Sequence, residues 1–258
     1  MPYDSQKLAD WPDKVEAAIE GIVELVVAGT LEMGPDNPAT EPWLSDSVGL
    51  ERTYIRRALA VLSRDNIVGQ IPGEGAWVWP VHVADLQRMT KLRHRIEIPA
   101  ACSLVSRDPM PDLSVLDAWS EYLIQVTKSG ASFSVNSLIY ADTGFHSALT
   151  AAGGYALGSK AIETWGRRAR MYFSRPEHHE ILAGGYSGIV AATEKIFKCI
   201  SERDAGVSEF SEWYFEEWRR LLAITPANGT LSIEVDDGSP IFEPARSGLR
   251  RSRRASVS

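Results

Sequence analysis

Residues 40–79, TEPWLSDSVGLERTYIRRALAVLSRDNIVGQIPGEGAWVW, decide the fold of the N-terminal part of the chain. Thr40 is a favourable helix N-cap, and Pro42 in the first turn costs no hydrogen bond because its missing N–H has no partner there. This helix ends at Gly49, and a second helix begins around Glu51. Two helices joined by so short a turn predict a helix-turn-helix.

The second predicted helix has a buried stripe and a polar face. The stripe runs from Ile55 to Leu62, with apolar residues at i, i+3, i+4 and i+7. In a helix-turn-helix the first turns of the second helix enter the major groove of DNA. Four side chains near the helix start are therefore expected to contact bases or phosphates: Arg52, Thr53, Arg56 and Arg57. The alternative interpretation is that this outer face is only solvated.

A predicted hairpin follows and favours the DNA-binding interpretation. Residues 67–68 and 77–79 are apolar and are separated by turn residues 72–75, which is typical of two short strands that form a wing. Helix, turn, helix and hairpin in this order predict a winged helix-turn-helix. Thr40, at the start of the first helix, and Gly75, in the wing, complete the predicted DNA-binding residues.

Residues 12–82 resemble the GntR family of bacterial transcription regulators. The resemblance rests on residues 43–68 and on an upstream turn, AGTLEMGP at residues 28–35, with residues 15–27 as the first helix. It implies a DNA-binding regulator. Two positions depart from the family pattern: Glu51 stands where Ser is usual, and Glu74 stands in the wing where a basic residue is common.

The DNA-reading segment is acidic. Residues 1–82 hold 6 Lys/Arg against 13 Asp/Glu, a net charge of −7. Neutralisation of phosphates drives most of the affinity of proteins for DNA. To bind DNA, this acidic segment therefore needs basic residues gathered in a small patch. The C-terminal residues 246–254 carry five arginines and either assist DNA binding or form a mobile, solvated tail. The basic positions of the recognition region are Arg52, Arg56, Arg57 and Arg64.

The whole chain has 258 residues, enough for two domains with cores of their own. Its net charge of −7 argues against a general nucleic-acid coat protein. With two cysteines, no signal peptide and no long apolar run, we expect a cytoplasmic protein without a disulfide framework or a membrane span. No internal repeat is visible.

Beyond a linker at residues 80–85 the sequence has helical periodicity throughout. In the first helix, the apolar residues Met89, Leu92, Ile96 and Ala100 form the expected buried stripe. Because no alternating strand pattern interrupts the run, we expect an all-α bundle. The predicted helices cover residues 86–105, 113–127, 134–150, 157–173, 176–200 and 210–222.

The predicted fold class is therefore mainly α, with an N-terminal winged helix-turn-helix and a C-terminal all-α helical bundle. The expected domains are residues 1–82, the DNA-binding domain, and residues 83–228, the effector-binding domain. Residues 229–258 form a C-terminal extension with a strand candidate at 231–235 and a basic tail.

Asp142 and His146 lie four residues apart on a predicted helix, on one face, where both could hold one metal ion. His178 begins a later helix, and ligands from several helices can converge in a bundle core. The alternative is a simple helix-surface pair between Asp142 and His146, which is the commoner arrangement.

The second half resembles the FCD ligand-binding domain of FadR-type GntR regulators. The resemblance rests on residues 92–101, 141–154 and 177–182 and covers about residues 88–201. It implies a divalent metal, zinc- or nickel-like, held by an Asp and three His. Asp142, His146 and His178 match, whereas the fourth position carries Cys199. Cys199 is either a thiolate ligand or a buried structural residue, and His179 replaces His178 if the helix register differs by one.

Arg93 matches the position where, by this resemblance, an Arg faces the effector. A guanidinium forms a planar, two-pronged pair with a carboxylate, so a small-molecule carboxylate is the expected effector. The alternative is a surface ion pair with Glu97 at i+4.

The leading functional hypothesis is a homodimeric regulator that binds double-stranded operator DNA and is controlled by a small organic acid. One alternative is a metal-dependent enzyme that uses Asp142, His146 and His178, although no nucleophile motif or Gly-rich phosphate loop is visible. Another is a regulator whose DNA module has decayed and that acts through protein contacts. The first hypothesis implies no catalysis and no membrane partner.

Overall fold

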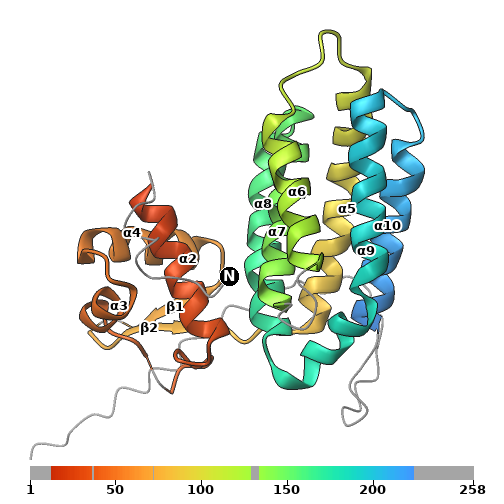
Figure 1. Ribbon diagram of the computed structural model, residues 1–258. Coiled ribbons are helices and arrows are strands. Elements are labelled where there is room, and N and C mark those ends of the chain that lie inside the picture. Colours follow the sequence, from red (N-terminus) through yellow and green to blue (C-terminus); the bar gives the residue numbers. More distant parts are fainter. Residues whose placement is uncertain (1–12, 37, 72, 129–133, 224–258) are drawn as a thin grey trace, which may run out of the picture. The chain divides into compact units, whose positions relative to one another are not determined.

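The computed structural model of the chain describes residues 13–36, 38–71, 73–128 and 134–223. These residues are mainly helical, with one small hairpin, and this confirms the predicted fold class (Figure 1). No described helix is both long and apolar enough to cross a membrane. The elements of the first part are α2 (Lys14–Val27), α3 (Glu41–Val48), α4 (Arg52–Arg64), β1 (Val68–Ile71) and β2 (Gly75–Val78). Those that follow are α5 (Val83–Ser106), α6 (Ser114–Lys128), α7 (Val135–Ala152), α8 (Ala156–Phe173), α9 (Pro176–Glu202) and α10 (Val207–Ala223).

The turn between α3 and α4 forms as the sequence predicts. The Thr40 side chain accepts a hydrogen bond from the Trp43 amide at 3.4 Å, and Pro42 lies in the first turn. Gly49 ends α3 with a φ of 75°, a left-handed conformation that glycine adopts without strain. Helix α2 packs against α4, whose apolar stripe is buried.

The hairpin is tied to the residues that precede α3. Strands β1 and β2 are antiparallel, with a register that runs from Val68 opposite Val78 to Ile71 opposite Gly75, so the pairing extends further into the turn than predicted. Gly75 has a φ of 132°, and an added Cβ would lie 2.4 Å from the carbonyl oxygen of Ala39. A side chain at this position would therefore separate the wing from the chain before α3.

Helices α5–α10 run alongside one another as a bundle (Figure 1). Helix α7 packs along α6 and α8, while α10 packs along α9 and α5. Large side chains from four helices fill the centre, and a fully buried Trp165–Trp218 edge-to-face pair has ring centroids 4.7 Å apart. The predicted helices are all found, with bounds that differ by a few residues, and α5 starts within the predicted linker at Val83.

The predicted buried stripe of α5 is only partly right. Ala100 is fully buried and Met89 packs against the core, but Leu92 is 49% exposed. The buried face includes the polar residues Thr90, Arg93 and Glu97 in its place. The periodicity of apolar residues missed this face because Arg93 and Glu97 satisfy each other's charge inside the bundle. The strand candidate at residues 231–235 and the basic tail lie outside the described residues, and the division into domains stays a prediction.

Candidate functional site

The N-terminal half of α4 carries the predicted DNA-contacting side chains. Arg52, Thr53, Arg56 and Arg57 are all exposed, whereas the opposite face of the helix is buried against the core of the winged helix. Thr40 is exposed at the start of α3 and Gly75 is half-buried at the start of β2. The structure thus places the predicted residues on the helix-turn-helix and the wing, and their contacts with DNA stay predictions.

Arg56 is engaged by a partner that sequence analysis missed. Its Nη2 lies 2.7 Å from Glu41 Oε2 and its Nε donates to Glu41 Oε1 at 3.1 Å, a two-pronged pair between α4 and the first turn of α3. This hydrogen bonding lowers the pKa of Glu41. The two residues are 15 positions apart, so no helical spacing could have indicated the pair.

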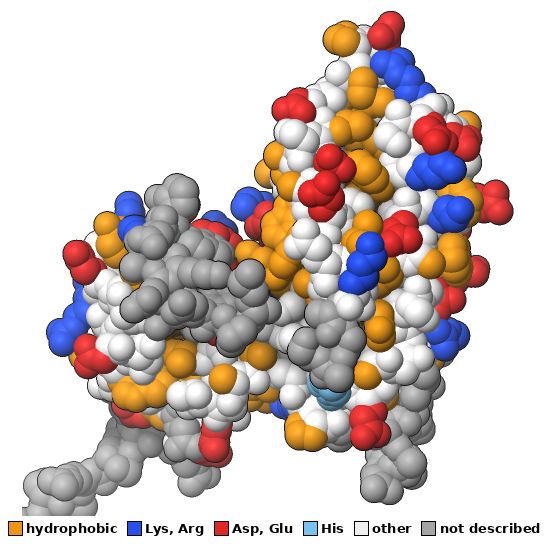
Figure 2. All heavy atoms as spheres, in the orientation of Figure 1, with side chains coloured by type: hydrophobic (Ala, Val, Ile, Leu, Met, Phe, Trp, Pro, Cys, Tyr) orange, Lys and Arg blue, Asp and Glu red, His pale blue; other side chains and the backbone are white. Residues whose placement is uncertain are grey.

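Charges of both signs are interspersed on the face of the molecule drawn in Figure 2. Blue and red side chains alternate over the bundle, and the first part shows basic side chains at its edge beside acidic ones. The prediction of DNA binding therefore relies on individual basic residues of α4 and not on a broad basic surface.

A buried cluster of five polar residues occupies the bundle: Arg93, Glu97, Asp142, His146 and Tyr214. Arg93 pairs with Glu97 at 2.6 Å and donates from Nη2 to the Tyr214 hydroxyl at 2.9 Å. Tyr214 in turn donates to Asp142 Oδ2 at 2.8 Å, and His146 Nδ1 lies 2.6 Å from Glu97 Oε2. The ion pair of Arg93 with Glu97 therefore exists, but it is buried and not on the surface.

The charges of the buried cluster shift one another's titration. Burial raises the pKa of Glu97, but the neighbouring Arg93 and His146 outweigh it and lower that pKa. Burial raises the pKa of Asp142 and that of the Tyr214 hydroxyl. Glu97 is thus held as a carboxylate beside the guanidinium of Arg93, which is the permanent cation of the buried cluster.

Three polar atoms of the buried cluster form no hydrogen bond of good geometry with a described residue: Arg93 Nη1, Asp142 Oδ1 and His146 Nδ1, although the last lies close to Glu97 Oε2. The atoms of Arg93 and Asp142 are fully buried, where an unsatisfied donor or acceptor costs about 1–3 kcal/mol. His146 Nε2 lies 3.8 Å from Asp142 Oδ1, beyond hydrogen-bonding distance. A small polar molecule that reached this point could satisfy both atoms.

The predicted metal ligands do not form one coordination group. Asp142 and His146 are neighbours, but His178 stacks on Tyr172 with ring centroids 3.9 Å apart and has its Nδ1 3.0 Å from the Tyr172 carbonyl. Cys199 is buried and its thiol faces Asp204. In the described ranges no three His, Cys, Asp or Glu side chains are placed to hold a metal ion together. The side chains as arranged do not fit a metal centre, and metal binding stays a prediction.

Ion pairs that sequence analysis also missed join α2 to α8. Arg167 lies 2.6 Å from Glu16 and 3.2 Å from Glu20, and Arg170 lies 2.5 Å from Glu20 and also pairs with Glu24. The spacing offered a signal: the three glutamates recur at i, i+4 and i+8, and the two arginines at i and i+3, one face in each helix.

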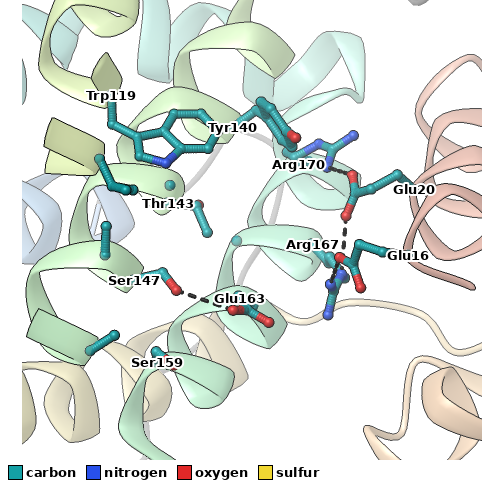
Figure 3. Close-up of a pocket in the computed structure, with 15 residues that line it drawn as sticks. Glu16, Glu20, Trp119, Tyr140, Thr143, Ser147, Ser159, Glu163, Arg167 and Arg170 are labelled. Atoms are coloured by element: carbon teal, nitrogen blue, oxygen red, sulfur yellow. Dashed lines mark hydrogen bonds and ion pairs between the residues drawn. The ribbon is translucent and has the colours of Figure 1, made fainter. Parts of the chain in front are cut away.

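A cavity of about 350 Å³ opens beside these ion pairs, and we refer to it as the α2–α8 cavity (Figure 3). Its wall comes from α2, α6, α7 and α8. The residues that contribute to it are Glu16, Glu20, Val115, Trp119, Tyr140, Thr143, Gly144, Ser147, Ala148, Ala151, Ser159, Glu163, Gly166, Arg167 and Arg170.

Acid should weaken the link between α2 and α8. Burial raises the pKa of Glu20, but Arg170 and Arg167 outweigh it and hold that pKa below its usual value of 4.5. The stability that Glu20 contributes is therefore complete above pH 4.5 and is lost as the pH falls through the lowered pKa. Thermal melts from neutral pH to about pH 3 should show a smaller acid-induced fall in Tm for Glu20→Gln than for the wild type.

The contribution of Asp142 to the pH dependence of stability has the opposite sign. Its raised pKa makes the folded state less stable as the pH rises. The comparison of Glu20→Gln with the wild type leaves Asp142 unchanged in both proteins and so isolates Glu20. The exposed residue Glu121 provides a surface control. If Glu20→Gln and Glu121→Gln changed the acid response equally, the assignment to the α2–α8 ion pairs would be wrong.

Three solved structures share this architecture. A GntR chain from Rhodococcus sp. RHA1, named as a transcriptional regulator, is 18% identical with a TM-score of 0.59 over 82% of this chain and 99% of its own. E. coli McbR/YncC is 17% identical, with a TM-score of 0.53 over 82% and 94% of the two chains. Lar of Listeria monocytogenes is 13% identical, with a TM-score of 0.52 over 82% and 97%. No family model and no curated protein matches the sequence.

The class that this fold defines is a winged helix-turn-helix followed by a helical bundle. It is the fold of solved GntR-type transcriptional regulators, and at these identities the likeness shows the fold alone. The GntR-like fold expected from the sequence is confirmed, whereas the FadR-type branch and its FCD domain stay predictions.

Proposed function

We propose that this chain is a DNA-binding transcription regulator of the GntR family that reads its operator with α4. The observation that carries the proposal is the exposed row Arg52, Thr53 and Arg57 at the start of a helix whose other face is buried. In a helix-turn-helix this is the part of the second helix that reaches base edges and phosphates. The wing and the shared fold support the same function.

The proposal includes the FadR-type branch, with a cytoplasmic homodimer that binds a near-palindromic operator. A small carboxylate effector would bind in the bundle at Arg93, whose Nη1 is an unused buried donor among the described residues. Because Arg93 is almost fully buried and already holds Glu97, such an effector would have to open the bundle or replace Glu97. No described contact favours the metal-dependent enzyme or a regulator that acts through protein contacts alone.

Arg52→Ala and Arg57→Ala should each weaken operator binding by about 1–3 kcal/mol, because each removes a guanidinium from the face of α4 that enters the groove. The operator is first selected from random DNA with the wild-type protein. Fluorescence anisotropy over a salt series then measures affinity, and the loss of one phosphate contact should reduce the salt slope by about one unit.

Lys160→Ala is the matched control, since Lys160 is an exposed basic residue of α8 outside the helix-turn-helix. Glu41→Gln tests the same surface in the opposite direction: it releases Arg56 from its carboxylate partner and should tighten binding. Equal affinity for the wild type, Arg52→Ala and Arg57→Ala would exclude α4 as the recognition helix. Failure of the wild type to select any DNA sequence would exclude the proposed function.

A further inference from the structure

The α2–α8 cavity lies apart from the buried cluster and shares none of its residues. Its volume of about 350 Å³ falls within the range of small-molecule sites in proteins, about 300–1,000 Å³. Glu16 and Glu20 bring the first helix of the DNA-reading part into its wall, while the rest of the wall belongs to the bundle. A molecule bound here would contact both parts of the proposed regulator.

One side of the cavity is apolar and aromatic. Trp119 packs so closely on α7 that a Cβ added to Gly144 would lie 2.4 Å from its indole, and the ring of Tyr140 meets it edge-on at 5.5 Å. Ala148 and Ala151 extend this side along α7. An indole with neighbouring methyl groups offers a flat apolar surface, and its ring face attracts cations.

The positive charges in the wall are already neutralised. Arg167 and Arg170 are 6% and 2% exposed, and each pairs with two glutamates of α2. An anionic ligand would therefore have to displace a buried glutamate from a guanidinium. Replacing a partner in a buried ion pair leaves an uncompensated charge, which is strongly unfavourable.

The carboxylates of the wall are in excess. The wall holds three carboxylates, Glu16, Glu20 and Glu163, against two guanidiniums. Glu163 also pairs with the exposed Lys160, which lies outside the wall, at 2.9 Å. Burial raises the pKa of Glu16, and the neighbouring Glu20 and Glu163 raise it further against the opposing effect of Arg167. Figure 3 shows Trp119 and Glu16 on opposite sides of the cavity, with Glu163 between them and lower in the view. A cation placed near Glu16 and Glu163 would offset their repulsion.

A neutral polar group also lacks a partner at this site. Thr143 lines the cavity, is 9% exposed, and its hydroxyl forms no hydrogen bond with any described residue. The hydroxyl lies against Gly166, another wall residue, where an added Cβ would be 2.2 Å away. A polar atom of a ligand could satisfy this hydroxyl, which the protein alone leaves unpaired.

We propose that the α2–α8 cavity binds a small organic amine, with its ammonium group beside Glu16 and Glu163 and its apolar or aromatic body against Trp119. Such a ligand competes with Arg167 for the partly exposed Glu16 and with Lys160 for Glu163, while Arg167 keeps its pair with Glu20. It thereby changes the ion pairs that join α2 to α8. Because α2 packs on α4, the amine alters operator affinity. This regulatory step rests on the proposed function, whereas amine binding does not.

Three indole compounds that differ only in their polar end test the proposal: tryptamine, tryptophol and indole-3-acetate. Calorimetric titration of the full chain should show that tryptamine binds at least tenfold more tightly than either of the others. Glu163→Gln should reduce tryptamine affinity at least tenfold, whereas Glu121→Gln, at an exposed residue of α6 outside the cavity, should leave it unchanged. Trp119→Leu should also weaken binding.

Several outcomes would overturn the amine site. These are equal binding of indole-3-acetate, full affinity in Glu163→Gln while its thermal melt matches the wild type, or no binding of tryptamine, phenethylamine and agmatine at millimolar concentration. Measuring operator affinity with and without tryptamine tests the regulatory step separately from the proposed DNA-binding function. Amine binding without any change in operator affinity would overturn the regulatory step alone, and an absence of operator binding in both conditions would overturn the proposed function.

Discussion

Arg93→Met should lower the free energy of unfolding by about 3–5 kcal/mol, the usual cost of removing one partner from a buried ion pair. The variant leaves the Glu97 carboxylate almost fully buried, with the His146 imidazole as its remaining close polar neighbour. It also removes the donor to the Tyr214 hydroxyl, which then has only its bond to Asp142. Urea denaturation followed by far-UV circular dichroism measures the change.

Lys91→Met provides the matched control, since Lys91 is an exposed cation two residues away on α5. The double variant Arg93→Met with Glu97→Met should recover part of the loss, because a buried pair replaced by apolar side chains is often close to neutral. A single-variant loss no larger than that of Lys91→Met would show that the buried cluster does not hold the bundle together.

Trp165→Ala should cost about 3–5 kcal/mol of unfolding free energy, the range for removal of a fully buried aromatic side chain. Trp165 is fully buried, packs edge-on against Trp218 and donates from its indole N–H to Thr90 Oγ1 at 3.1 Å. The Arg93 guanidinium lies 4.1 Å from the centroid of its ring. The indole therefore supports the buried cluster as well as the apolar core.

The effects of Trp165→Ala and Arg93→Met should not add, because the two side chains are in contact. A double-variant cycle in urea measures their coupling. Trp213→Ala, at a partly buried position of α10, is the control and should cost clearly less. Full additivity would contradict a shared cation–π contact, and a loss for Trp165→Ala equal to that of Trp213→Ala would contradict its central place in the core.

The sequence predicted the helix-turn-helix well because its signals are local. The Thr40 cap, Gly49 in a left-handed conformation and the stripe on α4 each depend on neighbours within a few residues. The bundle helices were likewise found from their periodicity. Some boundaries differed by a few residues, as in β1, which extends to Ile71 because β2 pairs with it.

The polar interior of the bundle was harder to predict. Arg93, Glu97 and Asp142 resemble surface residues in any count of apolar periodicity, yet each is buried because its partners lie on the same or facing helices. Tyr214 enters the buried cluster from a position 72 residues away from Asp142. Residues so far apart in the sequence have no helical spacing from which their contact could be predicted.

The same limit applies to the surface sites. The pair of Arg56 with Glu41 depends on the angle between α3 and α4, which the sequence does not encode locally. The α2–α8 cavity depends on residues from four helices, although the glutamate and arginine spacings marked the two faces that meet there. The metal hypothesis relied on the helical spacing of Asp142 and His146 and on the resemblance to a known domain, and the structure gives His178 and Cys199 other neighbours.

The wing is closed onto the chain ahead of α3 by main-chain bonds: Ala39 and Ala76 exchange hydrogen bonds at 2.7 and 2.9 Å, and Met33 bridges to Val78. If this part binds operator DNA as proposed, a chimaera that imports another operator preference must keep its contacts to the bundle. These include the row of acids on α2 that meets Arg167 and Arg170, and the main-chain carbonyl oxygens of Asp65 and Asn66 that accept from Arg168.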